Sequence, residues 1–129
     1  MTDGEIQEYK LLARHFDVRV LPSLMNDHLP QGPLALADFG CGDGPFFSAL
    51  HQMGSISPAN PVYAVDLHRD RLDRVASRFP FIVTVESPAD DVPTIPDATL
   101  DFVISTMVLE HISDEAKFLD EIQRVLKPG

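Results

Sequence analysis

The chain has 129 residues, a length typical of one domain, and 44% of them are hydrophobic. Its net charge of -10, from 20 acidic and 10 basic residues, argues against nucleic-acid partners and against docking on an anionic membrane. A single cysteine excludes an internal disulfide, and the acidic, polar start MTDGEIQEYK does not resemble a signal peptide, so we expect a cytoplasmic protein.

The N-terminal segment is expected to be helical and to lie over the rest of the chain as a lid. Its apolar side chains, among them Tyr9 and Phe16, recur at helical spacing, and Pro22 ends or restarts the helix. These two aromatic residues fit a lid over a ligand and ordinary core packing equally well. The lid segment would cover residues 1–33, and the core domain would cover residues 34–129.

Strands and helices are expected to alternate along the core domain. Four apolar runs predict strands at residues 34–39, 61–66, 81–86 and 100–106. Residues 46–53 suit a helix with Pro45 at its tolerated first turn. A second helix is expected through Leu72 and Val75 until Pro80 stops it. An acidic, proline-rich loop covers roughly residues 87–98.

The last helix has the clearest pattern, and Ser113 is its expected N-cap. Helical spacing predicts one apolar face, made of Ala116, Leu119, Ile122, Val125 and Leu126. The opposite face would meet water through Asp114, Glu115, Asp120, Glu121 and Arg124. Lys127, Pro128 and Gly129 then end the helix.

This alternation predicts an α/β fold, a doubly wound Rossmann-like parallel sheet with strand order 3-2-1-4. Strands that are apolar almost throughout are typical of a parallel sheet covered on both faces. We expect the fold to be truncated after the fourth strand and its following helix. The fourth strand would then be an exposed edge, through which copies of the chain could self-associate.

A glycine-rich bend follows the first expected strand in the sequence DFGCGDG, which contains Gly40, Gly42 and Gly44. Glycines at such a bend let the chain turn sharply and let a ligand touch the backbone. Asp66 ends the second expected strand, where a carboxylate can accept the hydroxyls of a ribose. Together these features predict a site for an adenosine-containing ligand, whereas the bend alone would fit a plain strand–helix turn.

Two residues favour S-adenosylmethionine over a nicotinamide nucleotide. Pro45 stands where the dinucleotide fingerprint has its third glycine. The carboxylate of Asp38 would repel a pyrophosphate but would suit a ligand that carries an ammonium and a sulfonium.

Four segments carry a family resemblance. LADFGCGDG resembles the first motif of class I S-adenosylmethionine-dependent methyltransferases, and VYAVDLHRDRLDRV resembles their second. LDFVISTMVLEHISD and the following EIQRVLKPG resemble the fourth-strand segment and next helix of the group often called type 11. The resemblance implies methyl transfer from S-adenosylmethionine to an unidentified acceptor, which we expect to be a small molecule.

The resemblance also implies which residues hold the cofactor. Its methionine part would lie among Asp38, Gly40, Cys41, Gly42 and Gly44. The ribose and adenine would be held by Asp66, Leu67, Ala89 and Asp90, and the site would be closed by Thr106 and Met107. One position departs from the family, because Pro88 replaces an acidic residue that often accepts from the adenine amino group.

Residues that could take part in chemistry are few. Glu110 and His111 are the candidate general bases, although ordering the adjacent loop is the plainer role for His111. Cys41 is expected to be a small spacer rather than a nucleophile, and no histidine has the spacing of a metal ligand. Two alternatives stay open, a non-catalytic S-adenosylmethionine-binding module and a less favoured nicotinamide-nucleotide oxidoreductase domain.

Overall fold

The computed structural model of this chain describes residues 24, 27, 31–106 and 112–128. The helices expected before residue 31, with Tyr9 and Phe16, therefore lie outside the described residues. The same holds for three predicted site residues, Met107, Glu110 and His111.

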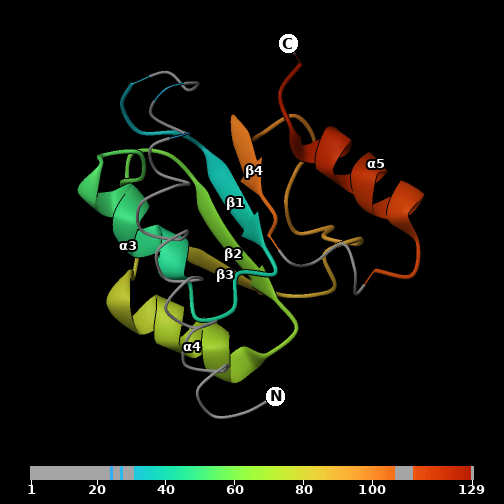
Figure 1. The fold of residues 1–129 in the computed structure, drawn as a ribbon, viewed down its shortest axis with the longest axis horizontal. Coiled ribbons are helices and arrows are strands. Elements are labelled where there is room, and N and C mark those ends of the chain that lie inside the picture. The colour runs from blue at the N-terminus through green and yellow to red at the C-terminus, as the bar shows by residue number, and fades with distance from the viewer. Residues whose placement is uncertain (1–23, 25–26, 28–30, 107–111, 129) are drawn as a thin grey trace, which may run out of the picture.

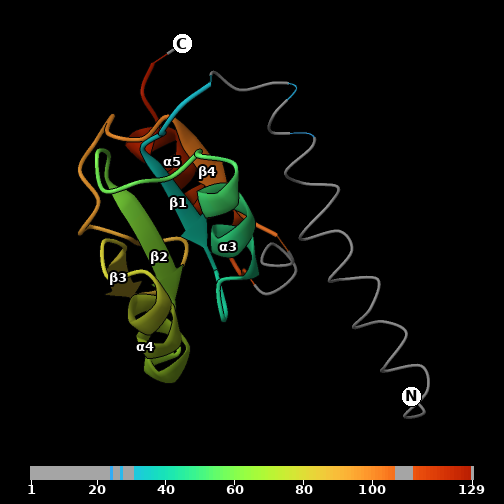
Figure 2. The same ribbon diagram turned by 90° about the vertical axis from the view of Figure 1, so that its left-hand side faces the viewer.

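A four-stranded parallel sheet has the strand order β3-β2-β1-β4, which confirms the predicted fold class and order. Its strands are β1 (Leu36–Phe39), β2 (Val62–Asp66), β3 (Val83–Glu86) and β4 (Phe102–Ile104). The helices are α3 (Pro45–Gln52), α4 (Arg69–Arg78) and α5 (Glu115–Val125). Helices α3 and α4 lie on one face of the sheet and α5 lies on the other (Figure 1). Helix α4 packs against β2 and β3 (Figure 2).

The strands are shorter than the apolar runs that predicted them. Phe81 and Ile82 lie in a turn before β3, because Ile82 N donates to Phe79 O and closes the end of α4. The prediction of a strand over residues 100–106 was wrong at both ends. Leu100 instead pairs with Leu126 after α5. The residues just before β4 therefore pair with the residues just after α5.

Two apolar clusters cover the two faces of the sheet, because neighbouring side chains of a strand point to opposite faces. The α3 and α4 side includes Leu36, Phe47, Leu50, Val62, Leu72 and Val75. The α5 side includes Ala37, Phe39, Val65, Val85, Val92, Ile95, Phe118 and Val125. Val92 and Ile95 come from the loop after β3, so this loop takes part in the core.

The predicted apolar face of α5 was right at Ile122, Val125 and Leu126, which pack in the core, and wrong at Leu119 and Ala116. Phe118 and Val125 are the buried residues of the helix, whereas Leu119 is 59% exposed. Ala116, also placed on the apolar face, is exposed. The N-cap is Asp114, whose side chain accepts from Lys117 N at 3.0 Å, and not Ser113.

Two residues of α5 that were expected to face water do not do so. The side chains of Glu121 and Arg124 are only 11% and 29% exposed, because they bond to the loop after β3.

Within the described part of the chain, β4 has β1 as its neighbour and stands at one margin of the sheet. Self-association through this edge stays a prediction. No helix among the described residues has the length and apolarity that a membrane span requires.

Candidate cofactor site at the carboxyl ends of the strands

The glycine bend after β1 has the backbone geometry that the sequence predicted. Gly40, Gly42 and Gly44 have φ angles of 77°, 58° and 74°, in the left-handed region that glycine enters without strain. Gly40 N and Cys41 N both donate to Val65 O, at 2.8 and 3.0 Å. The bend is therefore fixed to the end of the neighbouring strand β2.

Two of these glycines have different surroundings. A Cβ atom on Gly44 would lie 2.8 Å from Phe47 Cδ2 and 2.9 Å from Val75 Cγ2, both in the core. A Cβ atom on Gly42 would meet nothing within 4 Å. Gly44 thus lets helices α3 and α4 pack closely, whereas Gly42 leaves open space beside the bend.

Asp66 is directed at the glycine bend. Its Oδ2 accepts from Gly42 N and its Oδ1 accepts from His68 N, each at 2.9 Å. The residue is only 7% exposed, yet it reaches a cavity at the carboxyl ends of the strands. Each carboxylate oxygen has a further lone pair, so this fixed group can still accept hydroxyl hydrogens from a ligand.

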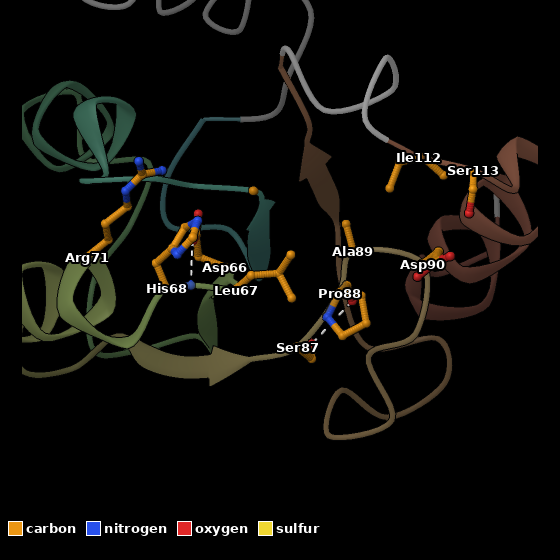
Figure 3. A pocket seen from close by; sticks show the side chains of 11 residues that line it. Asp66, Leu67, His68, Arg71, Ser87, Pro88, Ala89, Asp90, Ile112 and Ser113 are labelled. Carbon is orange, nitrogen blue, oxygen red and sulfur yellow. Dashed lines mark hydrogen bonds between the residues drawn. The ribbon is translucent and has the colours of Figure 1, made fainter.

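The cavity beside Asp66 has a volume of about 530 Å³, within the range of small-molecule sites. Its lining residues are Gly40, Asp66, Leu67, His68, Arg71, Ser87, Pro88, Ala89, Asp90, Ile112 and Ser113. Figure 3 shows Leu67 extending toward Pro88 and Ala89, with His68 and Arg71 on the other side of it. Leu67 is 64% exposed, which leaves an apolar surface for a flat ring.

The structure thus brings five of the predicted cofactor residues together around one cavity, namely Gly40, Asp66, Leu67, Ala89 and Asp90. Cys41 and Gly42 instead line a second cavity, together with residues of α4. Gly44 packs in the core, and Asp38 is buried in β1, just before the bend. Thr106 is half-buried and lies outside both sets of lining residues.

The second cavity is bordered by arginines of α4. Arg74 Nε donates to Asp43 Oδ1 at 2.8 Å, and Arg78 donates to the carbonyl oxygens of Asp43 and Gly44. These two arginines therefore tie the glycine bend to α4 at Asp43 and Gly44. Arg71 lines both cavities, and its side chain makes no hydrogen bond or ion pair among the residues that the structure describes.

The sequence did not reveal that Arg71 borders the site, because the run of opposite charges around it is typical of a solvated helix face. A usable signal was its place in the chain. Arg71 lies in the first turn of α4, directly after the strand end that carries Asp66. In a parallel sheet this turn lies beside the ligand crevice. His68, which precedes α4, could have been found in the same way.

Cys41 is unsuited to nucleophilic chemistry. Burial raises the pKa of its thiol, and the nearby carboxylates of Asp38 and Asp66 raise it further. The thiol therefore stays protonated at neutral pH, and only the thiolate is an effective nucleophile. These observations support a spacer role in the bend.

Comparisons with known proteins agree with this geometry. A methyltransferase domain family matches residues 37–129. A Mycobacterium tuberculosis protein named as a probable S-adenosylmethionine-dependent methyltransferase is 33% identical over 88 residues, which are 68% of this chain and 30% of that protein. A thiol S-methyltransferase from Homo sapiens is 29% identical over 101 residues, 76% of this chain and 40% of that enzyme.

A solved structure, an S-adenosylmethionine-dependent methyltransferase from Mesorhizobium loti, is 26% identical with a TM-score of 0.69. The match covers 83% of this chain and 48% of that one. The chain spans about a third of the length of the two curated relatives, 30% and 40%. Because the family match covers most of the chain and the fold agrees, the chain belongs to the class I S-adenosylmethionine-dependent methyltransferases.

Proposed function

We propose that this chain binds S-adenosylmethionine in the cavity at Asp66 and transfers its methyl group to a small-molecule acceptor. The observation that supports this most directly is the position of the Asp66 carboxylate, held between the glycine bend and the start of α4. A buried, preoriented acceptor pair next to an apolar wall suits a ribose joined to a flat base.

Different residues around the cavity are proposed to hold different parts of the cofactor. Asp66 accepts the ribose hydroxyls, and Leu67 and Ala89 enclose the adenine between apolar surfaces. The methionine part lies along the backbone of the glycine bend, above the carboxylate of Asp38. The bound cofactor supplies a methyl group already activated by positive sulfur, so the protein mainly has to orient the reactants and exclude water.

The adenine amino group needs an acceptor that Pro88 cannot provide through a side chain. Asp90 lies on the same loop, lines the same cavity and carries a carboxylate. Figure 3 shows Asp90 next to Ser113, on the opposite side of the cavity from Asp66. We therefore assign the recognition of the amino group to Asp90.

The acceptor is proposed to be a small molecule because the matched relatives include a thiol S-methyltransferase. If the acceptor must lose a proton, Glu110 or His111 would act as the base; both lie outside the described residues. The cytoplasm is the proposed compartment. No nucleic-acid or membrane partner is proposed, since the net charge of -10 disfavours phosphate-rich surfaces.

Titration calorimetry with S-adenosylhomocysteine and with NADH tests the cofactor. We expect binding of the first and none of the second, and preference for NADH would overturn the proposal. Methyl transfer from labelled S-adenosylmethionine to a panel of small thiols, amines and phenols then tests the reaction. Cofactor binding without transfer to any acceptor would favour the non-catalytic binding module.

A further inference from the structure

The loop after β3 forms one wall of the cavity although it has no regular secondary structure. Its first four residues, 87–90, line the cavity, and Val92 and Ile95 further along are fully buried. Apolar burial alone is non-directional and does not fix where each backbone group lies. Some directional contact must therefore set the position of this wall.

Arg124 of α5 makes such contacts with the loop. Its Nη2 donates to Val92 O at 2.9 Å, and its Nη1 donates to Ile95 O at 2.8 Å. The same Nη1 lies 2.7 Å from Asp97 Oδ1. A single planar guanidinium thus fixes three points of the loop, a task for which its rigid fork of donors is well suited.

Glu121 completes the arrangement from the preceding turn of α5. Its Oε2 accepts from Val92 N at 2.6 Å, and its Oε1 pairs with Arg124 Nε. Val92 is therefore held at its N–H by Glu121 and at its carbonyl oxygen by Arg124. With side chains 11% and 29% exposed, this ion pair is shielded from solvent far more than an ordinary surface pair.

The segment just before α5 also supplies part of the same cavity wall, which we call the adenine-side wall. Ile112 and Ser113, just before α5, line the cavity together with Ala89 and Asp90. The wall therefore has two segments, far apart in sequence, that are joined by α5 and its contacts with Val92. A shift of the loop relative to α5 would change the width of the cavity on that side.

We infer that Glu121 and Arg124 are a positioning pair, which sets the adenine-side wall of the cofactor cavity from outside the cavity. This rests on the proposed placement of adenine between Leu67 and the loop after β3. The pair does not touch the ligand and acts through the backbone of Val92. Its effect is specific to the adenine end, because the ribose and methionine ends are built on β1, β2 and the glycine bend.

Lys127 offers a matched control from the same end of the molecule. Its Nζ donates to Asp101 Oδ1 at 3.0 Å, so it ties the segment after α5 to the start of β4 and leaves the loop at Val92 untouched. Replacing Lys127 with methionine removes one cation and its ion pair with Asp101. Replacing Arg124 with methionine also removes one cation, together with its ion pairs with Glu121 and Asp97. Only the replacement of Arg124 removes contacts to the loop.

The test compares two ligands on the wild type, R124M and K127M. S-adenosylhomocysteine has the adenine, whereas S-ribosylhomocysteine has the same ribose and homocysteine without it. We expect R124M to lower the affinity for S-adenosylhomocysteine about tenfold, equivalent to roughly 1.4 kcal/mol, while the affinity for S-ribosylhomocysteine changes little. K127M should leave the affinities for both ligands unchanged. Thermal unfolding of each variant shows that it is folded.

If R124M weakened both ligands equally, or neither, the positioning role would be overturned. Should R124M fail to fold, E121Q gives the same comparison, because it keeps the volume of Glu121 but removes the charge that pairs with Arg124. A wild type that binds S-ribosylhomocysteine as tightly as S-adenosylhomocysteine would instead refute the proposed adenine site itself. The two failures are therefore distinct.

Discussion

The carboxylate of Asp66 accepts a hydrogen bond from Gly42 N at 2.9 Å and so joins the end of β2 to the bend that follows β1. The contact links the two features on which the proposed cofactor site rests, the acid and the glycine bend. It also gives Asp66 two tasks, because the group that would accept the ribose also holds the bend in place. A substitution at this residue is expected to affect both.

Asp66→Ala should weaken S-adenosylhomocysteine binding by roughly 1–3 kcal/mol, the scale of lost hydrogen bonds to a charged group. Glu86→Ala is the matched control. Glu86 is the register partner of Asp66 on β3, is exposed, and lies outside the residues that line the cavity. Calorimetry that shows equal losses for the two variants would remove Asp66 from the site.

Arg71→Ala is expected to weaken S-adenosylhomocysteine binding by about 1 kcal/mol, since it removes an unengaged donor from the Asp66 end of the cavity. Arg69→Ala should leave the affinity unchanged. Arg69 has the same charge and belongs to the same helix, but it pairs with Asp73 and Glu86 away from the cavity. The two dissociation constants, measured at one salt concentration, decide the point. An unchanged affinity in the Arg71 variant would mean that Arg71 does not contact the ligand.

The fold could be predicted well because its signals are local and repeated. Apolar runs bounded by glycine and proline located the four strands, and only the strand ends were placed wrongly. The order of the strands followed from the doubly wound topology. Leu119 shows where helical periodicity does not decide which residues are buried. An apolar stripe on α5 can be drawn through either Phe118 or Leu119, which are neighbours in the sequence. The choice of the stripe with Phe118 depends on packing against a loop that sequence patterns do not describe.

The site was predictable where a motif places the residue at a strand end, as with Asp66 and Gly40. A residue's role was not predictable where it depends on contacts with residues far away in the sequence. Gly44 looks like the other glycines of the bend, yet Phe47 and Val75 decide its role. Arg124 looks like a solvated helix residue, yet its acceptors lie on a loop before β4.

Gly44→Ala and Gly42→Ala compare a glycine that is packed against the core with a glycine that lies beside open space. Both place alanine at a positive φ, which costs roughly 1–2 kcal/mol. Gly44→Ala also drives a methyl group against Phe47 and Val75, so its free energy of unfolding should fall by about 1–3 kcal/mol more. Urea denaturation of the two variants measures the difference. Equal losses would contradict the packing role of Gly44.

Cys41 should react slowly with a thiol reagent in the native protein. Burial and the carboxylates of Asp38 and Asp66 raise the pKa of the thiol, so little thiolate is present at neutral pH. The rate with a chromogenic disulfide reagent should rise steeply when the protein is unfolded in urea. A native rate close to the unfolded rate would contradict the buried position of the thiol in the bend.

The ion pair of Glu121 and Arg124 should make stability depend on pH. The Arg124 guanidinium and the Val92 amide hold the pKa of the Glu121 carboxyl below its ordinary value of 4.5. A depressed pKa gives a stabilising contribution that is complete above pH 4.5 and is lost as the pH falls through the lower, folded-state value. The difference in unfolding free energy between the wild type and Glu121→Gln should therefore be largest at neutral pH and shrink in acid. Denaturation curves at pH 7 and at successively lower pH measure it, and a difference that stays constant would mean that the charge on Glu121 contributes nothing to holding the loop.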